Sequence, residues 1–126
     1  MPKTVPATPS APSAMGPYSF ATEAGGLVFL SGQVALDPAS GGRRPDDIEI
    51  QARQVMDNIG AILGDLGLSY GDIVKTTIFL ADMGDYPKVN EVYASYFGTE
   101  PPARSAIQAG ALPGGFLVEI EVVAAR

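Results

Sequence analysis

The sequence contains no cysteine and no histidine. These two absences exclude thiol nucleophiles, disulfides, imidazole general bases and nearly all zinc sites, because each of them needs one of these side chains. Any catalysis must therefore use carboxylate, hydroxyl, guanidinium, amino or backbone groups, or water.

Basic residues are few, and long apolar runs are missing. Eight Lys and Arg stand against 14 Asp and Glu, and apart from Arg43-Arg44 the basic residues are scattered. A nucleic-acid surface needs clustered positive charge, so we expect no nucleic-acid partner. No stretch approaches the roughly 18 apolar residues of a membrane span, and the N-terminus lacks the apolar core of a signal peptide. We expect a cytoplasmic protein without a membrane partner.

Length and composition fit one domain. The chain has 126 residues, of which 46% are hydrophobic and 17% charged, as in globular proteins. Four prolines fall among the first 15 residues, together with Ala, Ser and Thr, which is typical of an extended arm. We expect an N-terminal arm at residues 1–10 and a single domain at residues 11–126.

Five segments have the composition of strands. They are residues 18–24, 27–33, 73–80, 103–109 and 117–124. Gly25-Gly26 separates the first two, which predicts a tight hairpin. The segment at 73–80 has apolar residues at both odd and even positions, and hence on both faces of the strand, so we expect it to be central in the sheet.

Two segments show helical spacing of apolar residues. One runs from residue 48 to 66, after the acidic pair Asp46-Asp47 and before Gly67. The other runs from residue 86 to 97 and follows Asp85, a candidate cap. The element order ββαβαββ, perhaps with a strand from the arm, indicates an α+β fold. We expect a mixed sheet of about six strands with both helices on one face.

Two helices can cover only one face of such a sheet. Period-two alternation places Ile73 and Phe79 on one face and Val74, Ile78 and Leu80 on the other, so both faces carry apolar groups. We therefore expect a homo-oligomer that meets through the helix-free face. The alternative is that the arm covers this face.

One arginine and two glutamates interrupt the largely apolar C-terminal segment. Glu119 and Glu121 point to the same side of their predicted strand. If the last two strands are adjacent, Arg104 lies near Glu119, and this pair could bind a small anionic substrate and orient water. A structural salt bridge between Arg104 and Glu119 at a subunit interface explains the pair equally well. We expect Glu121 to be an ordinary solvent or interface charge.

Three further polar residues give weak signals when taken alone. Tyr18 could be a core tyrosine, Ser31 could belong to a turn, and Asn90 could face solvent. No phosphate loop, dinucleotide fingerprint or metal-ligand spacing is present in the sequence.

Five blocks of the sequence resemble successive blocks of the Rid family, also called YjgF or L-PSP. They are SAPSAMGPYSFA, LVFLSGQVALDPASG, DNIGAILGDLGL, DIVKTTIFLADMGDYPKVNEVYASYF and PPARSAIQAGALPGGFLVEIEVVAA. The last block is the most specific, because it combines Pro-Ala-Arg-Ser, Leu-Pro and Val-Glu-Ile-Glu at the family's spacing.

The resemblance implies a chorismate-mutase-like α+β fold of the bacillus type and a homotrimer with ligand clefts between subunits. Members of the RidA type hydrolyse reactive enamines and imines, such as 2-aminoacrylate, 2-iminopropanoate and 2-iminobutanoate, to 2-keto acids and ammonia. The resemblance also implies that no metal or organic cofactor is used.

The resemblance further assigns roles to individual residues. The family's carboxylate-binding arginine matches Arg104, and its water-positioning glutamate matches Glu119. The remaining substrate-binding positions match Tyr18, Ser31-Gly32 and Asn90.

The chain departs from the family's pattern at two positions, Ala106 and Phe20. Ala106 stands where many RidA-type members have cysteine, and it could still act through its backbone carbonyl. Phe20 stands where the family often has a polar residue, which could alter the mouth of the cleft or only its packing.

Three other functions remain to be weighed. The same cleft could bind a 2-keto acid without turnover, and the family also includes reports of ribonuclease-like inhibition of translation and of holdase-type chaperoning. A nuclease is disfavoured because the chain is acidic and has no histidine.

Overall fold

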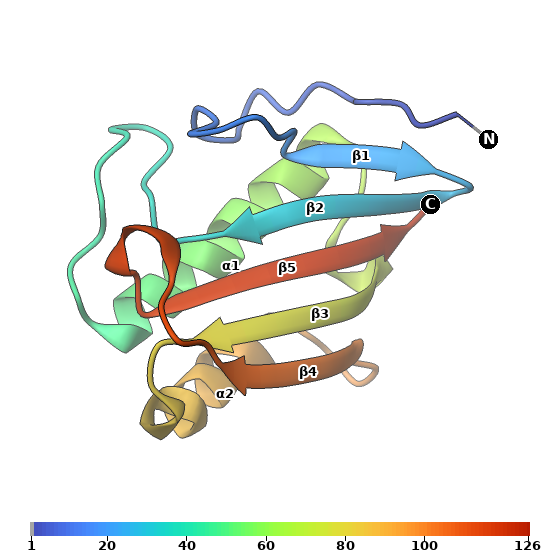
Figure 1. Cartoon of the computed structure of the whole chain (residues 1–126). Coiled ribbons are helices and arrows are strands. Elements are labelled where there is room, and N and C mark those ends of the chain that lie inside the picture. The colour runs from blue at the N-terminus through green and yellow to red at the C-terminus, as the bar shows by residue number, and fades with distance from the viewer. Residues whose placement is uncertain (1) are drawn as a thin grey trace.

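The framework of the computed structural model, which describes residues 2–126, is one five-stranded mixed sheet with two helices on one face (Figure 1). The strands are β1 (Ala21–Ala24), β2 (Leu27–Gln33), β3 (Ile73–Leu80), β4 (Ala103–Gln108) and β5 (Val118–Ala125). The helices are α1 (Ile48–Asp65) and α2 (Tyr86–Ala94), and three short 3₁₀ turns are η1 (Tyr70–Asp72), η2 (Met83–Asp85) and η3 (Pro113–Gly115). The predicted α+β class is confirmed.

The sheet has five strands rather than about six in the part of the chain that the structure describes. The arm contributes only an isolated bridge between Thr4 and Glu23, next to β1. Its other tie is made by Ser10, whose backbone N and Oγ donate to the Asp65 carboxylate at the end of α1, at 2.8 and 2.7 Å. Figure 1 shows the arm running along the β1 edge, so it does not lie across the helix-free face.

Local sequence signals place the first hairpin and α1. Gly25 and Gly26 have φ of 60° and 78°, a backbone that favours glycine, and they join β1 and β2 in an antiparallel pair as predicted. The Asp47 carboxylate caps α1 by accepting from the Ile50 N–H, and Gly67 with φ of 74° follows the end of the helix.

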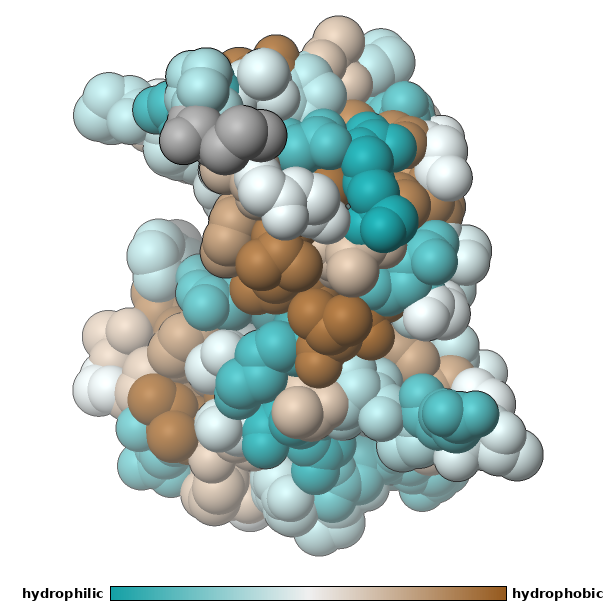
Figure 2. Space-filling view, turned by 90° about the vertical axis from the view of Figure 1, so that its right-hand side faces the viewer, coloured by the Kyte–Doolittle hydropathy of each residue, from teal (hydrophilic) through white to brown (hydrophobic). Residues whose placement is uncertain are grey.

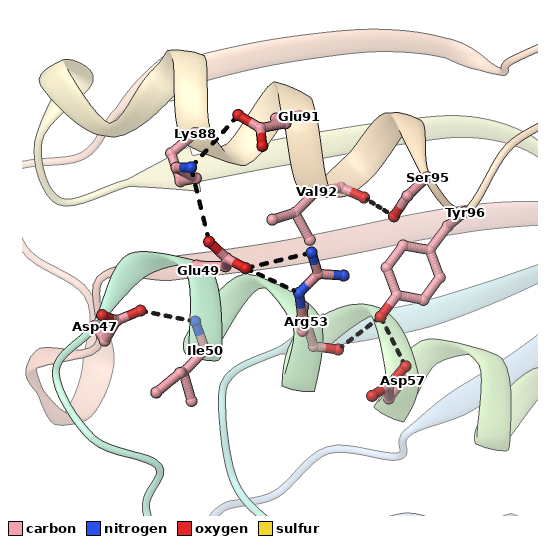
Figure 3. A network of polar contacts seen from close by, with 10 residues as sticks. All are labelled: Asp47, Glu49, Ile50, Arg53, Asp57, Lys88, Glu91, Val92, Ser95 and Tyr96. Atoms are coloured by element: carbon pink, nitrogen blue, oxygen red, sulfur yellow. Dashed lines mark hydrogen bonds and ion pairs between the residues drawn. The ribbon is translucent and has the colours of Figure 1, made fainter.

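A polar network on the solvent side links α1 to α2 (Figure 3). Lys88 Nζ lies 3.7 Å from Glu49 Oε1, and Glu49 Oε2 lies 3.3 Å from Arg53 Nη2. Tyr96 beyond α2 donates to Asp57 Oδ1 at 2.8 Å. Exposed ion pairs of this kind each contribute little stability, about 0 to 1 kcal/mol. Of these ion pairs only Lys88–Glu49 joins the two helices, so the network adds little to the packing of α2 on α1.

The order β1-β2-β5-β3-β4 corrects the expected pairing of the last two strands. Strand β4 pairs in parallel with β3, because α2 forms the crossover between them. Strand β5 then returns antiparallel on the other side of β3. Strand β5 is therefore the middle strand, β3 is interior but not central, and β4 is an edge.

A β-bulge corrects the faces assigned to the start of β3. The register shifts between Ile73 and Lys75, so strict alternation fails there. Ile73 is buried together with Ile78 and Leu80, whereas Val74 is 46% exposed. Phe79 lies on the helix-free face, opposite to Ile78 and Leu80, and these three residues therefore divide between the faces as predicted.

The helix-free face of the sheet, which faces the viewer in Figure 1, carries exposed apolar side chains. Phe29 on β2 and Ile107 on β4 are 43% and 49% exposed. Figure 2 views the molecule from the end of the sheet at which β2 and β3 begin, and hydrophobic side chains gather across this end. In the same view the surface of the molecule is hollowed on the side of the helix-free face. Within residues 2–126, Phe29 and Ile107 thus stay exposed on this face.

Candidate functional site

Arg104 lies on the helix side of the edge strand β4. Its register partner on β3 is Thr76, which is buried under α2. The Arg104 Nη2 donates to the Tyr86 hydroxyl at 2.8 Å, and its guanidinium carbon lies 5.0 Å from the centre of the Tyr93 ring. Tyr93 is itself held by a 2.8 Å hydrogen bond between its hydroxyl and Thr76 Oγ1. Two tyrosines of α2 therefore orient the guanidinium.

A cavity of about 380 Å³ opens beside Arg104. Its wall is mostly apolar and is lined by Asn90, Tyr93, Ala94, Phe97, Gly98, Pro101, Pro102 and Arg104. The buried Oδ1 of Asn90 has no hydrogen-bond partner within residues 2–126. Burial raises the pKa of Tyr93, against smaller lowering effects from Thr76 and Arg104, so its hydroxyl stays neutral. This cavity offers a cation and a free polar atom to a ligand.

Ala106 faces the core from β4 but does not line the cavity beside Arg104. The Ala109 N–H donates to Leu80 on β3, so by alternation the backbone groups of Ala106 point away from β3. The Ala106 carbonyl therefore lies on the free edge of the sheet, where a neighbouring molecule could reach it.

Glu119 lies on the opposite face of the sheet, in a second cavity of about 600 Å³. Its register partner is Phe79 on the helix-free face. Burial, and secondly the charge of Glu121, raise the pKa of Glu119 above the ordinary range of a glutamate. The site therefore holds a carboxylate whose affinity for a proton is increased.

Gly32 allows Glu119 to lie against β2. A Cβ placed on Gly32 would lie only 2.1 Å from Glu119 Oε2 and 2.8 Å from its Cδ. Only a residue without a side chain leaves this space to the carboxylate.

Ser31, Tyr18 and Phe20 belong to the same cavity as Glu119. Ser31 Oγ donates to the Ser19 carbonyl at 2.6 Å, so its lone pairs can accept a hydrogen bond from a ligand. Tyr18 and Phe20 pack edge to face with ring centres 5.5 Å apart. Phe20 therefore shapes the wall of the cavity by packing on Tyr18.

The predicted site residues thus fall into two groups. Asn90 and Arg104 line one cavity, while Tyr18, Ser31, Gly32 and Glu119 line the other. The expectation that Arg104 lies near Glu119 is wrong within one chain, because β3 separates their strands and the side chains point to opposite faces. An intrachain salt bridge between them is excluded for the same reason.

Three contributors were missed at the sequence level. Glu121, for which the sequence predicts an ordinary solvent or interface charge, lines the cavity of Glu119; the signal for this is that both glutamates point to the same side of their strand. Tyr86 and Tyr93 lie seven residues apart, two helical turns, which was the signal that both could face Arg104. The sequence pattern alone places both tyrosines in the apolar stripe of α2.

The structure offers no obvious metal centre within residues 2–126. No three His, Cys, Asp or Glu side chains come together there in a way that could hold a metal ion. Among those same residues, no helix is both long and apolar enough to cross a membrane.

The sheet order and the two cavities define an α+β protein with polar sites on both faces of one mixed sheet. In a comparison with known protein families, the model of the family described as "Endoribonuclease L-PSP" matches residues 8–126. The chain belongs to this family, the Rid (YjgF/L-PSP) family.

Named relatives cover nearly the whole chain. A mouse protein named 2-iminobutanoate/2-iminopropanoate deaminase is 45% identical over 124 residues, covering 98% of this chain and 92% of its own length. A RutC family protein of Pyrococcus horikoshii is 48% identical over 122 residues, covering 97% of each.

Solved structures of the family match the fold. A Rid family protein of Yersinia pestis superposes with a TM-score of 0.95 at 48% identity, covering 99% of this chain and 100% of that one. The structure of E. coli TdcF with bound serine superposes with a TM-score of 0.90 at 40% identity, covering 98% of each. The architecture described above is therefore that of Rid family structures.

Proposed function

We propose that this protein hydrolyses reactive enamines and imines of small 2-imino acids, such as 2-aminoacrylate, 2-iminopropanoate and 2-iminobutanoate, to 2-keto acids and ammonia. The observation that supports the proposal most strongly is the set of contacts that the Arg104 guanidinium makes. Within residues 2–126 this guanidinium donates to the hydroxyl of Tyr86 and contacts no carboxylate. A partly buried cation without a counter-charge is suited to bind the carboxylate of a substrate.

The working unit in this proposal is a homotrimer in which each site lies between two copies. Arg104 and Glu119 lie on different surfaces of one protomer, so a substrate that touches both needs the Arg104 surface of one copy and the Glu119 surface of the next. Such a head-to-tail arrangement closes into a ring. The apolar helix-free face, with Phe29 and Ile107 exposed, supplies the surface to be buried.

Each residue then has a role that follows from its geometry. Arg104 binds the substrate carboxylate with two parallel hydrogen bonds, and the free Asn90 Oδ1 accepts a hydrogen bond from the substrate or from a bound water. From the neighbouring copy, Glu119 orients a water and accepts one of its protons as the oxygen bonds to the imine carbon.

The second half of the step breaks the carbon–nitrogen bond. The proton held by Glu119 passes to the nitrogen, ammonia leaves, and the oxygen becomes the ketone of the product. Tyr18, Ser31 and the backbone beside Gly32 line the space for the nitrogen, and the Ala106 carbonyl is available to accept a hydrogen bond from it. Because these imines already react with water, orientation supplies much of the required acceleration. The proposed step uses neither a metal nor an organic cofactor.

Binding of a 2-keto acid without turnover would use the same contacts and is the competing function. The exposed apolar face would also suit a holdase if the protein were monomeric, whereas trimer formation would bury it. The cytoplasmic location, the lack of nucleic-acid or membrane partners, and the division into an arm at 1–10 and a domain at 11–126 remain predictions.

A diversion assay tests the proposed function. A threonine dehydratase generates 2-iminobutanoate in the presence of semicarbazide, which traps the imine, and added protein should divert it to free 2-ketobutyrate. Arg104→Ala should abolish this diversion, while Arg53→Ala, which removes an exposed arginine of the α1–α2 network, should not. If the unaltered protein diverts no imine, hydrolysis is not its function.

A further inference from the structure

The segment 113–117, which contains η3, Phe116 and Leu117, forms one wall of the Glu119 cavity and leads directly into β5. Its backbone has little regular support of its own. Gly114 and Gly115 have φ of 73° and 69°, and the turn is closed by the Gly115 N–H donating to the Leu112 carbonyl at 3.0 Å. Something outside the segment must therefore fix its position.

Arg43 reaches this wall from the loop before α1. Its Nη1 donates to the Gly114 carbonyl, its Nη2 donates to the Gly115 carbonyl at 2.9 Å, and its guanidinium carbon lies 4.1 Å from the centre of the Phe116 ring. A planar guanidinium can bridge two carbonyls and stack on a ring at the same time, which a lysine cannot do.

Asp46 and Gln51 extend this contact into the core. Asp46 Oδ1 accepts from Arg43 Nη2 at 2.9 Å and from Gln51 Nε2 at 3.2 Å. Gln51 is fully buried in α1, and its Oε1 accepts the Leu117 N–H at 2.9 Å. Arg43, Asp46 and Gln51 thus hold the wall at both ends, and Glu119 follows Leu117 by two residues.

We propose that Arg43, Asp46 and Gln51 form a clasp that positions Phe116, and that Arg43 thereby limits the size of the imino-acid side chain that the cavity accepts. Arg43 touches no reacting atom and acts through the wall, so it is a positioning residue. The size limit rests on the proposed function, whereas the positioning of the wall does not. Without the clasp, the Gly114-Gly115 backbone can move and carry the Phe116 ring with it.

The expected effect is a change of selectivity rather than a general loss of activity. A well-fitted apolar pocket discriminates between side chains that differ by a methylene by roughly 10- to 200-fold. Arg43→Gln should therefore reduce the preference for 2-iminobutanoate over the imine of leucine by about tenfold, chiefly through KM. Arg43→Lys should behave similarly, because a lysine keeps the charge near Asp46 but loses the planar fork.

The kinetic test compares kcat and KM for imines generated from 2-aminobutyrate and leucine by an amino-acid oxidase, with semicarbazide as the competing trap. Arg53→Gln is the matched control, since it removes an exposed, ion-paired arginine away from both cavities. A narrowed preference in both Arg43 variants, with the control unchanged, supports the proposal. An unchanged preference overturns the size limit, because a merely stabilising Arg43 would alter unfolding and not selectivity.

Amide hydrogen exchange provides a readout that needs no catalysis. Arg43→Gln should speed exchange of the Gly115 and Leu117 amides, whose hydrogen bonds depend on the position of the wall. If the unaltered protein hydrolyses no imine but exchange rises as expected, the proposed function fails and the positioning role stands. If exchange at these amides is unchanged in both Arg43 variants, the clasp is overturned whatever the activity. Arg43→Lys keeps the test valid if Arg43→Gln folds poorly.

Discussion

Arg104 and Glu119 lie on opposite faces of one sheet, with β3 between the strands that carry them. Arg104 is opposite Thr76, which faces the helices, and Glu119 is opposite Phe79, three residues further along β3 on the other face. No rotation of these side chains brings both to one small molecule within a protomer. A substrate held by both must lie between two copies.

Replacing Arg104 by lysine should show how much of substrate binding depends on the planar shape of the guanidinium rather than on its positive charge. Arg104→Lys keeps a cation but loses the planar fork that pairs with a carboxylate, so KM for 2-iminobutanoate should rise by about tenfold or more. Tyr86→Phe, which removes only the hydroxyl that accepts from Arg104, should have a smaller effect in the same direction. An unchanged KM in Arg104→Lys would move the carboxylate site away from this arginine.

The loss of activity on the acid side of the pH–activity profile should reflect protonation of Glu119. The glutamate must be ionised to accept a proton from water, and burial followed by the charge of Glu121 raises its pKa. Activity is therefore lost as pH falls through this raised pKa, earlier than for an ordinary glutamate. Glu121→Gln removes the second cause and should shift the acid limb of kcat/KM to lower pH.

The matched control for this shift is Glu91→Gln, which removes an exposed acid on α2 and should leave the limb in place. An identical acid limb in Glu121→Gln and the unaltered protein would mean that Glu121 does not act on the titrating group.

Glu119 should also cost stability at neutral pH. A carboxyl group whose pKa is raised on folding contributes stability below its unfolded pKa and loses that contribution as pH rises through its folded pKa. Glu119→Gln should therefore raise Tm at pH 7 relative to the unaltered protein, and the difference should shrink toward pH 4. Activity should fall by about 10²-fold or more in the same variant. A lower Tm at pH 7 would show that the ionised carboxylate is stabilised by the fold.

Gly32→Ala should damage the site without touching the reacting groups directly. The added Cβ would lie 2.1 Å from Glu119 Oε2, so the carboxylate must move by more than an ångström. A displacement of that size costs roughly 10²-fold in rate. Gly64→Ala is the matched control, because a Cβ there meets nothing within 4 Å, and it should retain full activity. Full activity in Gly32→Ala would show that the position of Glu119 is not critical.

The helix-free face should control assembly. Phe29 is 43% exposed in the protomer, and Phe29→Asp would place a charge in the proposed interface. Light scattering should give about three times 13.0 kDa for the unaltered protein and about one-third of that value for this variant. Val5→Asp, which changes an exposed apolar residue of the arm, should remain a trimer. A trimeric Phe29→Asp would place the interface elsewhere.

The sequence was sufficient where structure is decided locally. The hairpin at Gly25-Gly26 and the start of α1 at Asp47 follow from turn chemistry and capping, which act over a few residues. The faces of Glu119 and Glu121 follow from strand parity. The α+β class follows from the order of these elements.

The features that failed depend on contacts distant in the sequence. The place of β4 beyond β3 depends on a crossover through α2, and the bulge between Ile73 and Lys75 reverses the parity on which a face is assigned. The contacts of Tyr86 and Tyr93 with Arg104 likewise could not be predicted, because they form only when α2 packs under β4.

Mixing two inactive variants tests the composite site most directly. Arg104→Ala and Glu119→Gln copies are combined in equal amounts, unfolded together and refolded, and imine diversion is measured per protomer. Half of the copies supply Arg104 and half supply Glu119, so about a quarter of the sites between copies should carry both residues and activity should return to about that fraction. Activity that stays at the level of the separate variants would contradict a site shared between neighbouring copies.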